Sequence, residues 1–460
     1  MRKYWLLSCA FLLSCTVGPD YENNPVYSDE TIKNELKLSQ SGNSDYAWQT
    51  LFDDVQFRQL LAQGLQNSTD VKTAISKLRQ ARATRAINMA TFLPQIGLQG
   101  GYQYEKGSKN TKTGIDSQYY SVGFDASWEL DIWGQGRRQT EADSASVKAA
   151  EYGINDVKIS LAAEIASDYI YWLQSKKNLQ FAEQNVRLQQ DILSTVKAKY
   201  QNGLSDEASY EEARFLLENT QAQIPQYRAA VEQYLNALAA IMGVLPSQLN
   251  LQSAPTEILF KTNKSAKELT ELPASVVRIR PDVAEAEQRL IAQNALVGAA
   301  VADLYPSVSL SGLWGYAAQG GRKLFNSESQ TYNYAPSSVL PLLDWNKIKN
   351  NIKLQEYIKD EVFEQYRQAV INAVTEIKNA QVTYRENKIG ADNKYRAWQN
   401  MRTAADLTAA KYKNGLAEFS DVMRTQQNLL SAQQDYVAAR SAQIQSLIAF
   451  YKAIGVPAPK

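Results

Sequence analysis

The hydrophobic and polar positions along this chain of 460 residues follow two different periods. In three stretches, and more weakly in a fourth, apolar residues alternate with polar residues or glycine, as Tyr120, Val122 and Phe124 do with the residues between them. A period of two places the apolar side chains on one face of a strand and the polar ones on the other. The four predicted strands cover about residues 95–106, 119–131, 306–318 and 332–342.

Elsewhere, apolar residues recur every three or four positions over stretches much longer than an ordinary helix. No proline interrupts residues 135–201, and one helix through them would be roughly 100 Å long at 1.5 Å per residue. A seam that begins at Tyr366 steps by four and three residues, which is typical of a coiled coil. We expect long helices over about residues 135–201, 205–242, 346–413 and 417–454, and shorter ones over 54–91 and 282–304.

One short segment occurs twice in the chain. Lys-Tyr-Gln-Asn-Gly-Leu at residues 199–204 returns as Lys-Tyr-Lys-Asn-Gly-Leu at 411–416, an offset of 212 that also pairs Pro94 with Pro306. A fixed offset over this length indicates a tandem duplication. Each Asn-Gly should turn the chain between two long helices, because glycine adopts the left-handed conformation of a helix end without penalty. Ser205 is expected to cap the helix that follows the first turn.

The duplication and the N-terminal composition divide the chain into segments. Arg2 and Lys3 precede a short apolar run, which is typical of an export signal. The prolines and the many Asn and Ser residues that follow predict an extended tether. The predicted segments are a signal peptide over 1–14, a lipidated tether over 15–53, a first structural repeat over 54–245, a connector over 246–281 and a second repeat over 282–460.

The two cysteines, Cys9 and Cys15, both lie near the N-terminus, so the body of the protein contains no disulfide framework. Leu-Leu-Ser followed by Cys15 resembles a bacterial lipobox, in which the cysteine becomes the lipidated first residue. Thr16, the next residue, resembles the pattern of lipoproteins that are sorted to the outer membrane. Each buried methylene of a lipid chain contributes about 0.8 kcal/mol of membrane affinity, so Cys15 would anchor the chain.

Composition excludes several classes of function. With 49 basic and 48 acidic residues and a net charge of +1, the chain has no electrostatic footprint for nucleic acid. It contains no His, which is the commonest general base and metal ligand. No nucleotide-binding glycine motif is present. We therefore expect no enzyme activity, no metal site and no cofactor.

Four strands raise the question of what completes the sheet. Four strands cannot close a barrel around a lumen, and an open sheet edge is not tolerated in lipid. Several chains would have to share one barrel, although the periodicity does not fix their number. The alternative is a periplasmic coiled-coil scaffold lipoprotein that forms no pore. Such a scaffold has no need for alternating strands with an apolar face.

Several motifs together resemble one family over nearly the whole mature chain. They are Cys15–Tyr21, Phe92–Pro94, Trp128–Gly134, Arg280–Val283, Leu304–Ser307 and the two Asn-Gly turns. In combination they resemble the TolC/OprM type of outer membrane factor, the exit ducts of tripartite efflux pumps and type I secretion systems. The lipobox and Arg280-Pro281-Asp282 resemble the NodT-like, lipoprotein branch that serves drug efflux.

The resemblance implies a membrane α+β fold. A homotrimer would form a 12-stranded β-barrel in the outer membrane, with four strands from each chain, continuous with a 12-helix α-barrel across the periplasm. The implied partners are a periplasmic adaptor (membrane fusion) protein, an inner membrane transporter of RND type, and outer membrane lipid. The implied function is passive conduction of small molecules, such as drugs and toxic compounds, to the exterior. A type I secretion or metal efflux role within the same family stays open, because the cargo is not readable from this chain.

The resemblance also implies two sets of site residues near the turns. The two turns would be periplasmic tips where the adaptor docks, and an aperture near them would be closed at rest. A second acidic position of the family is occupied here by Arg424, so that a pair with Asp421 would bring the aperture closer to neutral. The implied tip residues are Asn202, Gly203, Leu204, Asn414, Gly415 and Leu416, and the implied aperture residues are Asp421, Arg424, Ser420, Ser209 and Glu212.

Overall fold

In a computed structural model of the chain, the described residues are 16–22, 25–36, 47–48, 51–52, 54–108, 110, 117–249, 251, 256–257 and 274–458. The predicted signal peptide and Cys15 therefore lie outside the described residues. The chain forms two compact units, and each unit takes segments from both sequence repeats. Unit 1 comprises Met1–Asn24, Ser76–Glu151 and Glu285–Gln368, and unit 2 comprises Pro25–Ile75, Tyr152–Ala284 and Ala369–Lys460.

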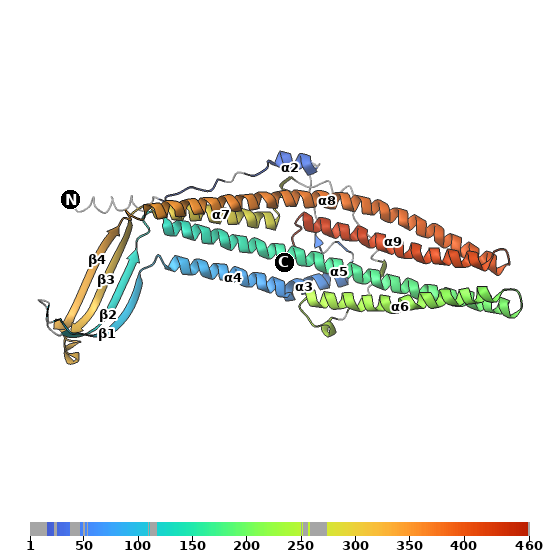
Figure 1. Cartoon of the computed structure of the whole chain (residues 1–460), viewed down its shortest axis with the longest axis horizontal. Helices are drawn as coiled ribbons and strands as arrows, with labels where there is room; N and C mark the ends of the chain where they lie inside the picture. Colours follow the sequence, from blue (N-terminus) through green and yellow to red (C-terminus); the bar gives the residue numbers. More distant parts are fainter. Residues whose placement is uncertain are drawn as a thin grey trace. The chain divides into compact units, whose positions relative to one another are not determined.

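Unit 1 contains one antiparallel sheet in which the strand order follows the chain (Figure 1). The prediction of four strands is confirmed. Each of the two strand pairs from the sequence repeats is a hairpin, and β2 pairs with β3 across the repeats. The strands are β1 Gln95–Glu105, β2 Ser117–Glu129, β3 Ser307–Ala318 and β4 Gln330–Val339.

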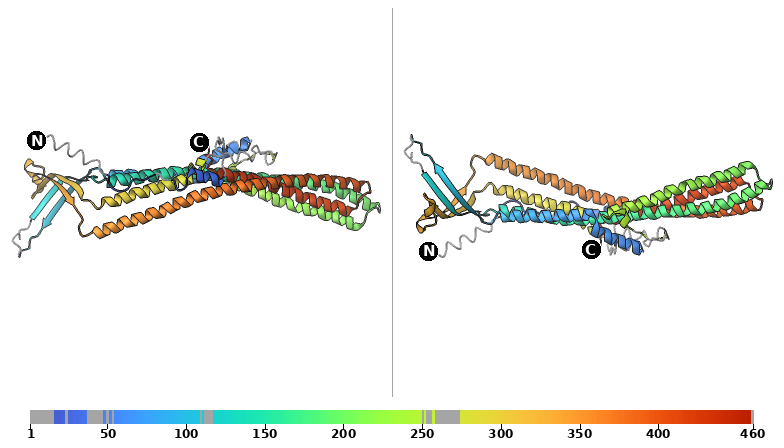
Figure 2. Two further views of the ribbon diagram at one scale, coloured as in Figure 1. Left: turned by 90° about the horizontal axis from the view of Figure 1, so that it is seen from above. Right: turned by 90° about the horizontal axis from the view of Figure 1, so that it is seen from below.

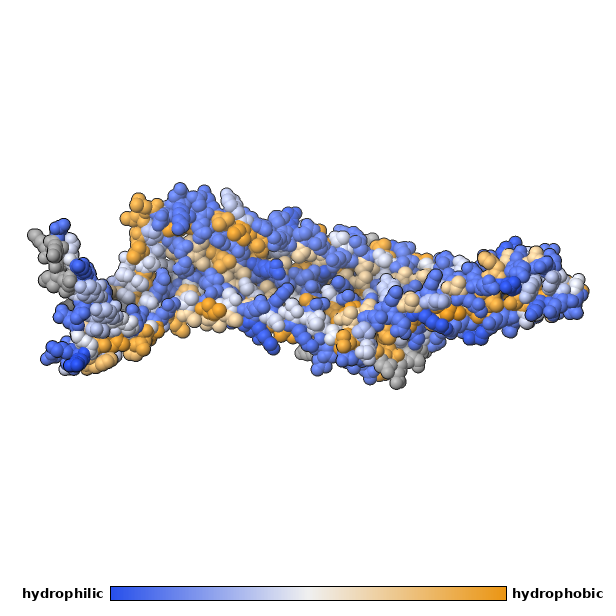
Figure 3. Space-filling view, turned by 60° about the horizontal axis from the view of Figure 1, so that its bottom comes forward, coloured by the Kyte–Doolittle hydropathy of each residue, from blue (hydrophilic) through white to orange (hydrophobic). Residues whose placement is uncertain are grey.

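The register aligns the alternating side chains into two different faces. Leu98 lies opposite Phe124, Phe124 opposite Trp314, and Trp314 opposite Tyr332, so one apolar row crosses all four strands. All four side chains are exposed in the single chain. Hydrophobic atoms are visible over part of the strand region at the left of Figure 3. Because β1 and β4 are the edge strands, the sheet ends in two open edges within the described part of the chain.

Six helices form most of the described structure outside the sheet. α4, α5, α7 and α8 contribute residues to both units, whereas α6 and α9 belong to unit 2. No helix among the described residues is long and apolar enough to cross a membrane. The bounds are α4 Thr69–Ala90, α5 Gln135–Gln201, α6 Glu207–Ile241, α7 Pro281–Ala302, α8 Trp345–Lys413 and α9 Phe419–Ala453.

The helix predicted over 54–91 is in fact two, α3 Val55–Asn67 and α4, so that prediction was wrong in one respect. The break lies at Ser68, whose ψ of 135° is not helical. The Ser68 hydroxyl accepts the backbone N–H of Asp70 at 3.2 Å, and its own N–H donates to the carbonyl of Gly64 at 2.9 Å. A serine that bonds its own backbone in this way competes with the helix.

The tether predicted over 15–53 also contains packed structure, which corrects the expectation of an extended segment. Helix α2 spans Asp29–Leu36, and its Ile32 and Leu36 are buried. Ser28 caps it by accepting the N–H of Thr31 at 3.2 Å. Trp48 is fully buried and donates its indole N–H to the carbonyl of Val456 at 2.8 Å. The segment is therefore fastened to unit 2 by apolar burial.

Candidate functional site

The two Asn-Gly turns have the same backbone geometry. Gly203 and Gly415 have φ values of 71° and 73°, the left-handed region that glycine favours. The next residue of each turn donates its N–H back five positions, from Leu204 to Lys199 at 2.8 Å and from Leu416 to Lys411 at 2.9 Å. This bond satisfies a helix-terminal carbonyl in the manner of a Schellman motif. The turns lie at one end of unit 2 in all three views (Figure 1, Figure 2).

The predicted tip residues are open to solvent in the single chain. Leu204 and Leu416 are each 76 % exposed, which is unusual for leucine and identical in the two repeats. A Cβ added at either turn glycine would meet no atom within 4 Å. Asn202 and Asn414 are also exposed. The structure thus presents two equivalent apolar points, each at the end of a helical hairpin.

The cap of α6 differs from the prediction that Ser205 would fill it. Asp206 is the N-cap, and its carboxylate accepts the N–H of Ser209 at 2.8 Å. The hydrogen bonds from Ser209 hold the pKa of Asp206 below its usual range. Asp206 takes this role because a carboxylate at a helix N-terminus combines capping with a favourable dipole interaction. Ser209, a predicted aperture residue, is therefore part of the cap.

Two of the predicted aperture residues form an ion pair. Arg424 donates to Asp421 at 2.7 Å across one turn of α9, and both side chains are substantially exposed. Ser420, next to Asp421, is exposed as well. Glu212 lies half-buried on α6, the corresponding helix of the first repeat. The negative charge of Asp421 is thus balanced locally, within its own chain.

The two hairpins pack together near these residues through an apolar cluster, the tip cluster. It joins Ile192, Val196 and Ala213 of the first repeat to Tyr412, Phe419 and Val422 of the second. Tyr210 and Met423 are partly buried against it. The cluster places the start of α6 beside the start of α9. Among the described residues, no hydrogen bond or ion pair links Ser209 or Glu212 directly to Asp421.

Lys199 makes a polar contact between the same two hairpins that the sequence analysis missed. Its ammonium donates to the carbonyl of Tyr412 at 2.7 Å and lies 4.0 Å from the centre of the Tyr412 ring. A cation near the last carbonyls of a helix is favoured by the helix dipole. The duplicated Lys-Tyr in the turn motif could have indicated this contact, whereas the sequence analysis drew a structural prediction from the Asn-Gly alone.

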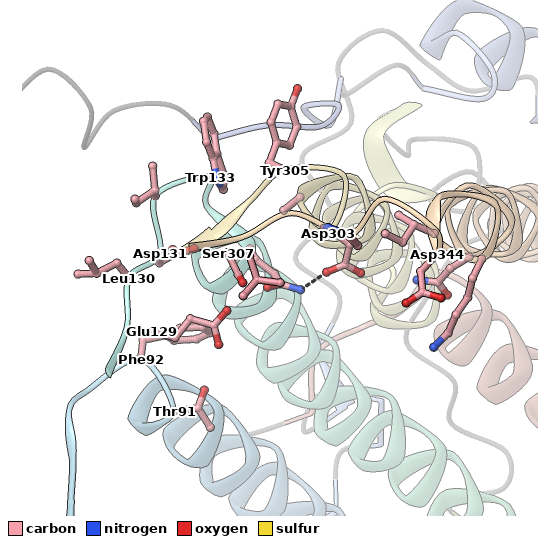
Figure 4. A pocket seen from close by; sticks show the side chains of 18 residues that line it. Thr91, Phe92, Glu129, Leu130, Asp131, Trp133, Asp303, Tyr305, Ser307 and Asp344 are labelled. Carbon is pink, nitrogen blue, oxygen red and sulfur yellow. Dashed lines mark hydrogen bonds between the residues drawn. The ribbon is translucent and has the colours of Figure 1, made fainter. Parts of the chain in front are cut away.

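A cavity of about 620 Å³ lies within unit 1, where strands meet helices (Figure 4). Glu129, Asp303 and Asp344 line it from three different junctions. Gln135 donates to Asp303 at 2.7 Å, whereas burial and the nearby charge of Glu129 raise the pKa of Asp303. Among the described residues, no group of carboxylates is arranged to hold a metal ion. The cavity has an acidic lining.

The N-terminal residues that follow Cys15 are fastened to unit 1 by Arg138. This buried side chain donates to the carbonyls of Val17 and Gly18, both at 3.1 Å, and to the carboxylate of Asp20 at 2.7 Å. Thr16 packs against Gly134, where a Cβ would come within 2.8 Å of it. The contacts hold the first described residues beside the start of α5.

Comparison with known proteins gives one family. The family model described as "Outer membrane efflux protein" matches residues 60–244 and 272–456. These two stretches have equal length and are displaced by 212 residues (272 − 60), which is the offset predicted from the duplicated turn.

Individual relatives extend over almost the entire chain. The chain is similar to the cation efflux system protein CusC of Escherichia coli (strain K12), with 27% identity over 454 residues and 96% of each chain covered. It is similar to the toluene efflux pump outer membrane protein TtgF of Pseudomonas putida, with 27% identity over 476 residues, covering 99% of this chain and 97% of TtgF. The solved outer-membrane channel OprN superimposes with a TM-score of 0.87 at 28% identity, covering 96% of this chain and 99% of OprN.

Proposed function

The chain belongs to the outer membrane efflux protein family, and from this premise we propose how it assembles and conducts. It is an outer membrane channel of tripartite efflux systems and not an enzyme, and it extends into the periplasm. Its fold is the TolC-like one, with four strands and long helices in each chain and two sequence repeats. We propose that the working unit is a homotrimer that conducts passively.

The observation that carries this proposal is the sheet with one exposed apolar face and two open edges. A sheet with open edges cannot stand in lipid, where each unpaired backbone group costs several kcal/mol. The β4 edge of one copy is free to pair with the β1 edge of the next. Three copies would give twelve strands, within the even numbers of known membrane barrels. The apolar row through Phe124 and Trp314 then faces lipid, and the Ser- and Gly-rich face lines the lumen.

We propose that partners drive transport, because the sequence contains no nucleotide-binding glycine motif. The channel belongs to an efflux system and therefore works with a pump. We propose a periplasmic adaptor protein at the tips and an inner membrane transporter of RND type behind it. The exposed Leu204 and Leu416, with the asparagine and glycine before each, give an adaptor two similar apolar points on every copy.

The aperture is proposed to lie where the starts of α6 and α9 converge, near the tips. Asp421, Arg424 and Ser420 would form its narrowest ring, with Ser209 and Glu212 from the first repeat beside them. Because Arg424 pairs with Asp421, three copies would bring together three nearly neutral pairs instead of three bare carboxylates. The pairs then stabilise the closed ring, since bare carboxylates would repel one another.

The anchor and the cargo follow from chemistry near the sheet. A lipid on Cys15 would sit one residue before Thr16, which packs against Gly134 next to the end of β2. We propose that this lipid anchors the chain in the outer membrane.

The relatives named for cation efflux and for toluene efflux differ in cargo, and the small polar side chains of the proposed lumen select little. Small molecules such as drugs and toxic compounds are therefore the proposed cargo class.

Conductance in planar bilayers tests the aperture. The purified protein is expected to open rarely, because three Asp421–Arg424 pairs close the ring. Asp421→Ala and Arg424→Ala each remove one half of the pair and should raise the open probability several-fold. The Arg424→Ala variant should open more, because it leaves carboxylates that repel one another.

An ion pair between α8 and α9 provides a matched control. Lys394 and Asp435 form an exposed ion pair at 2.8 Å between α8 and α9, away from the turns. Lys394→Ala and Asp435→Ala should leave the open probability unchanged. Equal openings in wild type and in both aperture variants would contradict the assignment of the aperture to Asp421 and Arg424. The absence of any conductance would contradict the duct.

A further inference from the structure

The Lys199 contact joins the two sequence repeats within one chain. The carbonyl of Tyr412 accepts two hydrogen bonds, one from the N–H of Gly415 at 3.1 Å and one from Lys199 at 2.7 Å. The second bond crosses from the hairpin of the first repeat to the hairpin of the second. A carbonyl has two lone pairs, so this arrangement satisfies it fully.

Each repeat has a Lys-Tyr pair before its Asn-Gly turn, so the chain contains a second lysine and a second tyrosine at equivalent positions. Lys411 stands 212 residues after Lys199, and Tyr200 stands 212 residues before Tyr412. The carbonyl of Tyr200 accepts the N–H of Gly203 at 3.0 Å, as the Tyr412 carbonyl accepts that of Gly415. Within the described part of the chain, however, no lysine reaches the Tyr200 carbonyl, and the ammonium of the exposed Lys411 makes no hydrogen bond or ion pair.

We propose that Lys411 of one copy donates to the carbonyl of Tyr200 of the neighbouring copy, reproducing between chains the contact that Lys199 makes within a chain. The inference rests on the proposed ring of copies. In such a ring the hairpins of the first and second repeats alternate, so each second-repeat hairpin lies beside the first-repeat hairpin of the next copy. The exposed ring of Tyr200 is stacked on Tyr210 at 5.6 Å, which leaves its other face for the ammonium.

Hairpins meet at two kinds of seam, one within a chain and one between neighbouring copies in the proposed ring. The two seams differ in the side chains that pack next to the lysine. Within the chain, the tip cluster buries six residues. At the 212-residue offset, Tyr200 matches Tyr412, the other five counterparts are smaller or more polar, and none of the six is buried in the single chain. These counterparts are Ala404, Thr408 and Thr425 on one side and Tyr200, Glu207 and Tyr210 on the other.

The seam between copies therefore depends more on the lysine contact than the seam within a chain does. Burying apolar side chains contributes about 25 cal/mol per Å², and this contribution is largely missing where Thr and Glu replace Val and Phe. Separation of the tips should begin between copies, while each chain keeps its own two hairpins together. Lys411 is thus a specific closing contact of the ring.

Cross-linking tests the contact directly. The full-length protein would carry the cysteine pair Lys411→Cys and Tyr200→Cys, and the matched control would carry Lys199→Cys and Tyr412→Cys. A short bismaleimide is used, because a lysine-to-carbonyl contact spans more than a disulfide does. On denaturing gels the first pair should give covalent dimers and trimers, whereas the control pair should give only an internally linked single chain. Protein without introduced cysteines should give neither product.

The native mass of the same samples separates two kinds of failure. A multi-chain particle whose control pair reacts internally, but whose Lys411→Cys and Tyr200→Cys pair gives no covalent ladder, overturns the proposed contact and leaves the duct intact. A particle of one chain overturns the ring itself.

A second variant avoids removing either tyrosine. Lys411→Met keeps most of the unbranched side chain and loses the ammonium, so the open probability in bilayers should rise several-fold. Lys411→Arg should restore closure, because its guanidinium still donates to a carbonyl. Lys413→Met removes a charge from the same exposed helix end and should change nothing. Equal openings for Lys411→Met and Lys413→Met would contradict the contact.

Discussion

At the scale of single residues, the charges near the two turns are held by local partners. Asp206 accepts a backbone N–H, Asp421 accepts from Arg424, and Lys199 donates to a carbonyl. Each contact joins a charged side chain to the end of a helix or to a charge one turn away. Such contacts are individually weak when exposed. In the proposed ring, each contact would be repeated in every copy, which would increase its effect on function.

The Asp206 cap should respond to acid. Because hydrogen bonds from Ser209 lower the pKa of Asp206 in the folded protein, the cap contributes stability above the ordinary value of about 3.9. This contribution is lost as the pH falls through the lower, folded value. Amide exchange of Ser209, corrected for its intrinsic rate, should therefore lose protection below about pH 4.

Asp206→Asn is the control for this prediction. Asparagine caps a helix about as well as aspartate and does not titrate in this range. Protection of Ser209 in that variant should stay constant across the same pH interval. A loss of protection that is identical in both proteins would show that acid acts elsewhere.

Some of the residue-scale picture was readable from the sequence. The two turn glycines were predicted from the duplicated Asn-Gly and have the expected left-handed backbone. The predicted pairing of Asp421 with Arg424 follows from their spacing of three on a helix. Lys199 was missed because its partner is a backbone carbonyl of another helix, and sequence spacing carries no information on such a contact.

At the scale of elements, the long helices and the strands were predicted well because each hydrophobic pattern repeats over many residues without interruption. α5 was expected over 135–201 and spans Gln135–Gln201. The break at Ser68 was missed because apolar spacing continues through it, and only the serine hydroxyl interrupts the helix. Helix α2 was missed because two buried residues, Ile32 and Leu36, give too little periodicity, and their burial depends on the rest of unit 2.

Helix ends should differ in their tolerance of a side chain. Gly203 and Gly243 both have positive φ, so alanine at either costs about 1–2 kcal/mol of backbone strain. A Cβ at Gly203 meets open space, whereas a Cβ at Gly243 would lie 3.0 Å from the carbonyl oxygen of Asn67. Gly243→Ala should therefore lower the thermal midpoint, followed by circular dichroism, more than Gly203→Ala. Equal midpoints would contradict this account of the two ends.

At the scale of the whole molecule, the sheet is the basis for our proposal that several chains form the working unit. The alternating pattern predicted which residues share a face in the first three strands, and the register places Leu98, Phe124 and Trp314 in one row that Tyr332 of the fourth strand continues. The pattern could not give the number of copies, because that number depends on strand tilt and curvature around a closed barrel. The match of the family model to both repeats fixes the family.

The number of chains in the native particle tests the central claim most directly. Light scattering of the purified protein, corrected for bound detergent, measures the protein mass of each particle. We predict three chains, which separate only on heating, because closing the sheet requires the β1 and β4 edges of neighbouring copies to pair. A particle of one chain, with its apolar sheet face and both edges still uncovered, would contradict the shared barrel.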